Sequence, residues 1–514
     1  MKRFLPFRGA GIRAAAVGTA AVVLAAGCSG DGGNEREPKP GPGSPNPSST
    51  AGPLQVQRVE LQSGPARLEL LALGRTDGGR VTAHFRLVSE TRPQGYFGSS
   101  FTYLDDKGFD IGGISLVDAV GNKLYFPLRT TTGECLCTTF EPGRLPESGS
   151  VDLYAVYPAP PDEVKSVTVR APLTTPFHDV ALASGPAVEA SALPVDPATA
   201  DLAAPVIRPL VSHAEGLEQS TDEEGEDKRV RISADVLFAV DKADLGPAAQ
   251  RILKNVAGQI DASSDDVVEV DGHTDDTGTP QHNQDLSRRR AEAVVKALEG
   301  LVTRTGVKFQ ARGHGETDPV APNGSAEGRR LNRRVAVAFL RPAPARPSAP
   351  PAAPGSGAFQ ESSPPPVVGT LRPKAPAGAV APVPEVETLQ YDVNAVHRDS
   401  AGLVSLVWSV TNKGSGEINL NASFSAWLTD RYKIVSTSGV SLVDPAAKVR
   451  YGPLRDDAGV CLCFQGNLSG NYSLAPGEKV TYGSLYKLPA DLETVDVEIP
   501  FYSSASTIEN LRVD

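Results

Sequence analysis

One aspartate and one arginine stand at a spacing that suits them to grip the two poles of an amino acid. Asp275 follows an apolar run at residues 267–270 that predicts a strand, and Arg290 lies in a predicted helix further along the chain. A carboxylate accepts hydrogen bonds from an ammonium group, and a guanidinium binds a carboxylate through two parallel hydrogen bonds. Together the two residues could hold a zwitterion. The alternative is that Asp275 and Arg290 pair with each other, or that Asp275 is a turn residue.

The predicted helix has one apolar stripe, and Arg290 faces it. Apolar residues recur at helical spacing at Leu286, Ala291, Val294, Val295, Leu298 and Leu301. At roughly 100° per residue, Arg290 lies inside the edge of this stripe, whereas Arg289 projects to the opposite face and Arg288 lies outside the stripe. A cation that faces a core needs an anionic partner, because burying an unpaired charge is costly. Arg290 is therefore the candidate binding residue, and Arg288 and Arg289 are expected on the solvated surface.

Residues 229–340 carry several motifs, in order, that resemble those of one family. The matching pieces are VLFAVDKADL at 236–245, GHTDDTG with the N, LS and RA that follow it at 272–291, and GRRLNRRVAV at 328–337. This stretch is similar to the OmpA-like domain, the peptidoglycan-binding module of OmpA-type porins, peptidoglycan-associated lipoprotein and the flagellar stator. The resemblance implies an α+β domain with a mixed sheet and helices on one face. Its first piece, 236–245, would form the first strand and the turn after it.

The resemblance also implies which residues bind the ligand. In that family a conserved aspartate and arginine hold the diaminopimelate of the peptide stem, and the matching positions here are Asp275 and Arg290. Asn283, Thr274 and Asp241 match other family positions near the pocket. The chain departs from the family at His282, where a tyrosine commonly precedes the asparagine. That departure concerns a packing contact near the site and leaves the acid and the arginine in place.

The first residues predict secretion and a lipid anchor. Basic residues precede an apolar run at 14–26, which is too short to span a membrane as a helix, and Gly27 and Cys28 follow. LAAGC, ending at Cys28, resembles a lipobox, in which the cysteine carries the lipid, palmitate included, and becomes the new N-terminus. The alternative is ordinary signal cleavage with Cys28 as a spare thiol. The total of five cysteines disfavours that alternative, because the other four fall in two matched pairs.

The chain contains an internal repeat. SLVDAVGNKLYFPLRTTTGECLC at 115–137 aligns without gaps to SLVDPAAKVRYGPLRDDAGVCLC at 441–463, with 12 of 23 positions identical. Period-two alternation around 81–87 and 404–410, and strand-like runs near Val167 and Val495, predict half-buried strands in each copy. Each copy is therefore expected to form an all-β sandwich, at 54–185 and 384–514.

Each copy carries a CLC motif, and secretion favours disulfides. We expect one bond inside each motif, Cys135 to Cys137 and Cys461 to Cys463. Such a bond requires a turn, because residues i and i+2 of a flat strand lie near the Cα limit for a bridge. The alternative is a soft-metal site of two thiolates, which the absence of a nearby histidine in the sequence disfavours, so we expect no metal.

The remaining segments are expected to be tethers and linkers. These are the signal peptide at 1–27, a Gly/Pro/Ser tether at 28–53, an Ala/Pro-rich and then acidic linker at 186–228, and a Pro/Ala-rich linker at 341–383. The acidic run at 222–227 is expected to be a solvated spacer. The net charge of -11 does not suggest a nucleic-acid-binding protein.

Two functions fit these features, and neither is catalytic. The chain has no nucleophile elbow, phosphate loop or HExxH motif, so we expect neither an enzyme nor a cofactor. The first hypothesis is a lipid-anchored protein of the cell membrane, or of the outer membrane where one exists, that binds peptidoglycan non-covalently and faces the wall or periplasm. The second is an envelope scaffold or receptor whose sandwiches bind a protein or carbohydrate partner, with wall binding serving only to position it.

Overall fold

The computed structural model describes residues 52–61, 64–90, 101–103, 110–139, 145, 149–188, 195–342, 366–373, 386–420, 424, 437–463, 473–501 and 504–514. The chain divides into two units, Met1–Ala51 and Gly52–Asp514, and all described elements belong to the second. The expected signal, lipidated Cys28 and most of the tether lie outside the described residues. The described part is mostly β-sheet with few helices, and none of its helices has the length and apolar character to cross a membrane.

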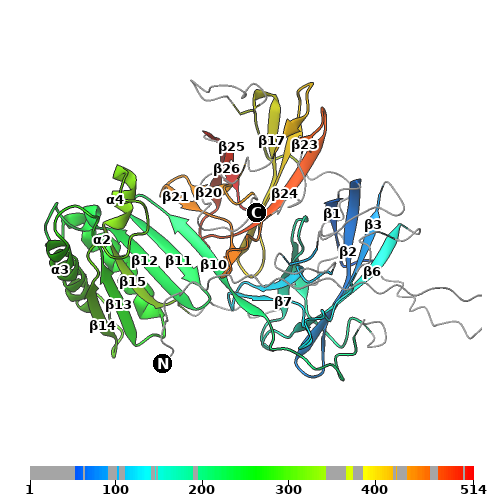
Figure 1. Cartoon of the computed structure of the whole chain (residues 1–514), viewed down its shortest axis with the longest axis horizontal. Helices are drawn as coiled ribbons and strands as arrows, with labels where there is room; N and C mark the ends of the chain where they lie inside the picture. Colours follow the sequence, from blue (N-terminus) through cyan, green and yellow to red (C-terminus); the bar gives the residue numbers. More distant parts are fainter. Residues whose placement is uncertain are drawn as a thin grey trace, which may run out of the picture. The chain divides into compact units, whose positions relative to one another are not determined.

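The first repeat consists of two sheets that share one core (Figure 1). One sheet has the order β1 (Gln55–Leu61), β2 (Gly64–Thr76), β3 (Arg80–Ser89) and β6 (Ser150–Pro158), with β9 (Ala183–Ser184) beside β2. The other contains β4 (Ser115–Asp118), β5 (Lys123–Tyr125), β7 (Ser166–Arg170) and β8 (Phe177–Ala181). Phe85 and Tyr157 from the first sheet and Val169 and Phe177 from the second are buried in the same cluster.

The second repeat is built in the same way. Its first sheet has the order β16 (Gly369–Leu371), β17 (Leu389–Arg398), β18 (Leu403–Asn412) and β24 (Lys479–Lys487). Facing strands are β20 (Ser441–Asp444), β21 (Val449–Tyr451), β22 (Arg455–Asp456), β25 (Thr494–Phe501) and β26 (Ser504–Arg512). A small pair, β19 (Ile418–Asn419) and β23 (Ser473–Leu474), and a short 3-10 helix, η2 (Val386–Thr388), complete it. Trp408 is fully buried at the centre, with its ring edge-on to Tyr391 and Phe424.

The central part is a mixed sheet covered by helices on one face. Its order is β14 (Lys308–Gly313), β13 (Val267–Gly272), β15 (Arg334–Leu340), β12 (Asp227–Ser233), β11 (Gln219–Glu224) and β10 (Ile207–Glu215), with β13 and β14 parallel. Its helices are α1 (Ala234–Leu237), α2 (Pro247–Ala262), α3 (Pro280–Glu299) and α4 (Ala326–Asn332). Figure 1 shows these helices beside the strands of the central sheet. Alternate strand residues such as Val268, Val270, Val335 and Val337 share a core with the apolar stripes of α2 and α3.

Both segments that were expected to be linkers contain strands. The expected linker at 186–228 contains β10 and β11, which extend the central sheet, so its acidic run is not a solvated spacer. Asp222 pairs with His213 and Arg231, and Glu223 pairs with Lys228 and Lys487. These cations make strand formation by an acidic segment favourable. Most of the other expected linker, 341–383, lies outside the described residues, although β16 falls within it and pairs with β17.

The piece at 236–245 was expected to form the first strand of the central domain, and it does not. Its first residues belong to the short helix α1, which the backbone N–H of Phe238 closes by donating to the carbonyl of Ala234. Only an isolated bridge joins Phe238 to Leu245. The helical turn buries both Leu237 and Phe238, which a half-buried strand with alternating faces would not do.

Candidate functional site

Arg290 is buried and forms no ion pair with a carboxylate in the part of the chain that the structure describes. It lies on α3, which begins after Thr279, whose side chain accepts a hydrogen bond from the backbone N–H of His282. Arg290 is 5% exposed, whereas Arg288 and Arg289 are exposed, as the helical periodicity predicted. Burial lowers the pKa of Arg290, although neighbouring carboxylates oppose this effect.

The contacts of Arg290 use only part of its guanidinium. Its Nε donates to the carbonyl oxygen of Lys242 at 2.9 Å, and the group lies over the ring of Phe238, 5.2 Å from the centroid. Neither contact supplies a negative charge, and among the described residues no carboxylate forms an ion pair with Arg290. Its two Nη groups are thus available to an anion, and a buried cation gains most from such a partner.

Asp275 is held in place by a different arginine. It follows β13 and is 6% exposed. Its Oδ1 accepts from the backbone N–H of Thr277 at 3.0 Å, and its Oδ2 accepts from Nη1 of Arg333 at 2.7 Å. Burial would raise the pKa of this carboxyl, but these hydrogen bonds outweigh burial and hold the pKa below its ordinary value. Asp275 is therefore a fixed, ionised carboxylate, and the alternative that it pairs with Arg290 does not describe this structure.

Arg333 is the residue that the sequence reasoning missed. It lies at the C-terminal end of α4 and, besides Asp275, it binds Asp235 through Nε at 2.8 Å and Nη2 at 2.6 Å. It belongs to the closing motif at 328–337, so its place in that motif was the available signal. Spacing alone could not show that its guanidinium reaches Asp275, because 58 residues separate the two.

The other expected site residues differ in how deeply they are buried. Asn283 is buried, and its Nδ2 donates to the carbonyl of Asp275 at 3.3 Å and to Oε2 of Glu316 at 2.6 Å. Thr274 is buried, and its Oγ1 has no hydrogen-bond partner in the described part of the chain. Asp241 lies on the exposed rim with a positive φ of 57°, and its Oδ1 is 2.7 Å from Nε2 of His282. His282 therefore contacts a site loop from the position where the family commonly has a tyrosine.

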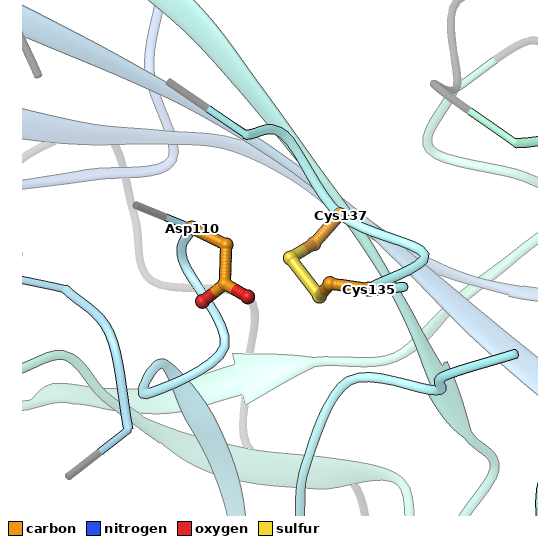
Figure 2. A group of neighbouring side chains, drawn as sticks. All are labelled: Asp110, Cys135 and Cys137. Atoms are coloured by element: carbon orange, nitrogen blue, oxygen red, sulfur yellow. A yellow bond between two sulfur atoms is a disulfide. The ribbon is translucent and has the colours of Figure 1, made fainter. Parts of the chain in front are cut away.

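A second group of chemically capable side chains lies in the first repeat. Figure 2 shows Asp110 beside Cys135 and Cys137. The possible ligand atoms of the three residues lie within 4.8 Å of one another. The two sulfurs form a disulfide, and the carboxylate pairs with Arg129 at 3.0 Å. A disulfide offers no thiolate, so this arrangement does not supply the ligands that a soft metal requires. Cys461 and Cys463 also form a disulfide.

The comparisons with known proteins concern the central domain. The family model described as OmpA family matches residues 237–333. The putative lipoprotein YfiB of Escherichia coli is 34% identical over 113 residues, which cover 22% of this chain and 69% of that protein. Outer membrane porin F of Pseudomonas aeruginosa is 42% identical over 106 residues, covering 21% and 30% of the two chains. Peptidoglycan-binding protein ArfA of Mycobacterium bovis is 38% identical over 104 residues, covering 20% and 31%.

The central domain is a mixed sheet with helices on one face, with a buried aspartate after β13 and a buried arginine on α3, as expected of an OmpA-like domain. The chain belongs to the OmpA family. The matched region spans less than a third of the length of porin F.

Proposed function

We propose that this chain is a lipid-anchored envelope protein whose central domain binds peptidoglycan non-covalently. The ligand is the diaminopimelate side chain of the peptide stem, and the result is a tether between membrane and cell wall. The observation that carries the proposal is the buried guanidinium of Arg290, which has no anionic partner among the described residues. The names of the relatives agree with a role of this kind, since one is a peptidoglycan-binding protein and another a putative lipoprotein.

The two charges are matched to the two ends of the ligand. Diaminopimelate ends in a carbon that bears both an ammonium and a carboxylate. The carboxylate would take the Nη groups of Arg290, and the ammonium would share the carboxylate of Asp275 with Arg333. Hydrogen bonds to charged groups contribute roughly 1.5–3 kcal/mol each, so loss of either residue should weaken binding about tenfold or more.

The remaining site residues shape the pocket around these charges. Asn283 ties the backbone of Asp275 to α3, and the Oγ1 of Thr274 is a buried polar atom available to a ligand. Asp241 and Lys242 lie in the loop that α3 holds at two points, through His282 and Arg290. We therefore assign Asp241 to the rim of the site and Lys242 to the support of Arg290.

The segments on either side of the central domain anchor the protein and flank the wall-binding site. Cys28 carries the lipid, the segment at 28–53 is the tether, and the protein faces the wall or periplasm from the membrane. The repeats at 54–185 and 384–514 are two-sheet sandwiches, which the shared cores of their facing sheets support. The protein is a binder and not an enzyme. The second candidate, a scaffold whose repeats bind a further partner, is compatible with this function.

The test compares two stem peptides that differ by one carboxylate. Lysine in place of diaminopimelate keeps the ammonium but lacks the terminal carboxylate. Calorimetric titration of the full chain should show at least about a tenfold preference for the diaminopimelate peptide. Arg290→Ala should abolish that preference, because the difference between the peptides is the group that Arg290 binds. Asp275→Ala should weaken both peptides.

Arg289→Ala is the matched control, since Arg289 is the exposed neighbour on the same helix. It should bind like the unaltered protein. A folded Arg290→Ala variant that still prefers diaminopimelate would show that Arg290 is structural and would refute this assignment.

A further inference from the structure

The two repeats present an equivalent strand edge. In the first repeat Leu116 of β4 pairs with Tyr125 of β5, and in the second Leu442 of β20 pairs with Tyr451 of β21. Both pairs are antiparallel and are related by the offset of 326 residues that relates the two sequences. The outer side of β5, and of β21, is the side on which each repeat can accept another strand.

One stretch of the chain occupies both edges, one after the other. Ile207 at the start of β10 pairs with Tyr125, and Ala214 near the end of β10 pairs with Tyr451. Backbone hydrogen bonds repeat the equivalence. The N–H of Phe126 donates to the carbonyl of Val206 at 3.2 Å, and the N–H of Gly452, its counterpart in the second repeat, donates to the carbonyl of His213 at 3.1 Å.

The equivalence extends to one residue type in the segment at 201–215 that pairs with both repeats. Leu202 forms a bridge with Thr130, and Leu210 pairs with Asp456, which is the counterpart of Thr130. The strand therefore places a leucine at the same register position on each repeat. Two matching leucines are expected if each repeat has a site that recognises this residue type.

Each leucine packs against an equivalent apolar patch of its own repeat. In the first repeat the patch consists of Leu128, Leu136 and Val156, with Leu202 packed against it. In the second repeat the cluster that contains Leu210 includes Leu454 and Leu462, the counterparts of Leu128 and Leu136. It also includes Leu485, which exchanges backbone hydrogen bonds with Leu454 and Leu462 as Val156 does with Leu128 and Leu136. The middle member of each patch, Leu136 or Leu462, is the central residue of the CLC turn that a disulfide closes (Figure 2 shows the first).

We propose that each repeat is a strand-binding module that recognises an extended, leucine-containing peptide. The edge strand supplies main-chain hydrogen bonds, and the patch around the CLC leucine supplies selectivity, which is the division of roles in β-strand addition. In this chain residues 201–215 are the bound peptide, and they fill both sites in cis. The site is separate from the proposed peptidoglycan site at Asp275 and Arg290 and does not depend on it.

Of the two sites, the one on the first repeat is the one that can release its strand and bind another. Leu210 is 1% exposed and lies in a cluster shared by both repeats, whereas Leu202 is only partly buried. Close to Leu202, Val206 and Ile207 are 41% and 44% exposed. The strand over the first site therefore buries less apolar area, and its release costs less free energy.

The experiment empties the first site and offers the strand in trans. A fluorescent peptide of residues 195–209 is titrated against the full chain carrying Leu202→Asp, with anisotropy as the readout. This variant should bind the peptide at least about tenfold more tightly than the unaltered chain, whose site is filled. The same peptide carrying Leu202→Asp should bind at least about tenfold more weakly, because an aspartate does not enter an apolar patch. Ala204→Asp, an exposed position in the same stretch, is the control and should leave the site filled.

Equal binding of the two peptides, or no binding by a Leu202→Asp variant with an unaltered melting curve, overturns the proposal. If that variant does not fold, hydrogen exchange of Leu202→Ala decides. The amides of Thr131 and Ala203 bond across this site, to the carbonyls of Asp201 and Arg129. They should exchange at least about tenfold faster while the amides of β3 keep their rates. Unchanged exchange at Thr131 and Ala203 shows that the leucine does not hold the strand.

Discussion

At the scale of single residues, the site depends on an uneven distribution of charge. Arg333 binds two carboxylates, those of Asp235 and Asp275, while Arg290 binds none among the described residues. Arg333 thus holds the carboxylate of Asp275 in place, and Arg290 remains available to bind an anion. A structural network would have paired each arginine, because an unpaired buried charge is costly.

Arg333 should also set the pH range over which Asp275 and Arg290 bind peptidoglycan. Burial would raise the pKa of Asp275, and the hydrogen bond from Arg333 holds it below the ordinary value of 3.8. Binding that needs the carboxylate is therefore lost only when the pH falls through this lowered pKa. In Arg333→Gln the pKa should rise, and co-sedimentation with peptidoglycan, measured from about pH 3 to about pH 7, should fail at a higher pH.

Arg330→Gln is the control for that measurement. Arg330 lies on the same helix but pairs with Glu327, so its loss should leave the acid limb of binding in place. If Arg333→Gln does not change the pH at which binding is lost, Asp275 is not the titrating group.

The sequence predicted part of this site and not the rest, for a physical reason. Helical periodicity placed Arg290 toward the core and Arg289 toward solvent, because both directions follow from local backbone geometry. The contact of Arg333 with Asp275 joins the end of α4 to a loop after β13, and local periodicity carries no information about such a tertiary contact. The cation–π contact of Arg290 with Phe238 was unpredictable for the same reason.

At the scale of elements, β11 shows how tertiary context overrides composition. Its sequence, QSTDEE, lacks apolar residues, so the sequence indicated a spacer. In the structure it lies between β10 and β12, and its acids form ion pairs with cations from both neighbouring and distant segments. Strand preference reflects the surface that a segment pairs with, and that surface includes Lys487, far away in the sequence.

Glu223 should make this junction sensitive to acid. Burial would raise its pKa, but Lys487 at 2.6 Å and Lys228 at 2.9 Å lower it from 4.5 to about 2. Its contribution to stability is therefore present above about pH 4.5 and is lost as the pH falls toward 2. Glu223→Gln should lower the free energy of unfolding at neutral pH by about 2 kcal/mol, because it leaves two lysines without their shared anion.

Thermal or denaturant unfolding at several pH values would check this. The difference between the variant and the unaltered chain should shrink as the pH falls below about 4.5. Glu224→Gln, at the exposed next position of β11, should change little at any pH. A constant difference for Glu223→Gln across the whole range would contradict the ion-pair explanation.

At the scale of the whole molecule, the segment between the first repeat and the central domain carries the connection. The duplicated CLC segments were evident in the sequence, because identity at a fixed offset needs no structural knowledge. That β10 pairs with strands of both repeats and with β11 could not be predicted, since its pairing partners lie on both sides of it in the sequence. β10 therefore connects the central sheet to strands of both repeats.

The central claim is that one chain holds both membrane and wall, and fractionation of cells tests it most directly. Two quantities are measured for each variant: the protein that sediments with peptidoglycan after detergent removes the membrane, and the protein that stays with the membrane after the wall is digested. The unaltered chain and Arg289→Ala should appear in both fractions. Asp275→Ala and Arg290→Ala should remain only with the membrane, and Cys28→Ser only with the wall. Folded Asp275→Ala and Arg290→Ala proteins that sediment with peptidoglycan like the unaltered chain would contradict the account.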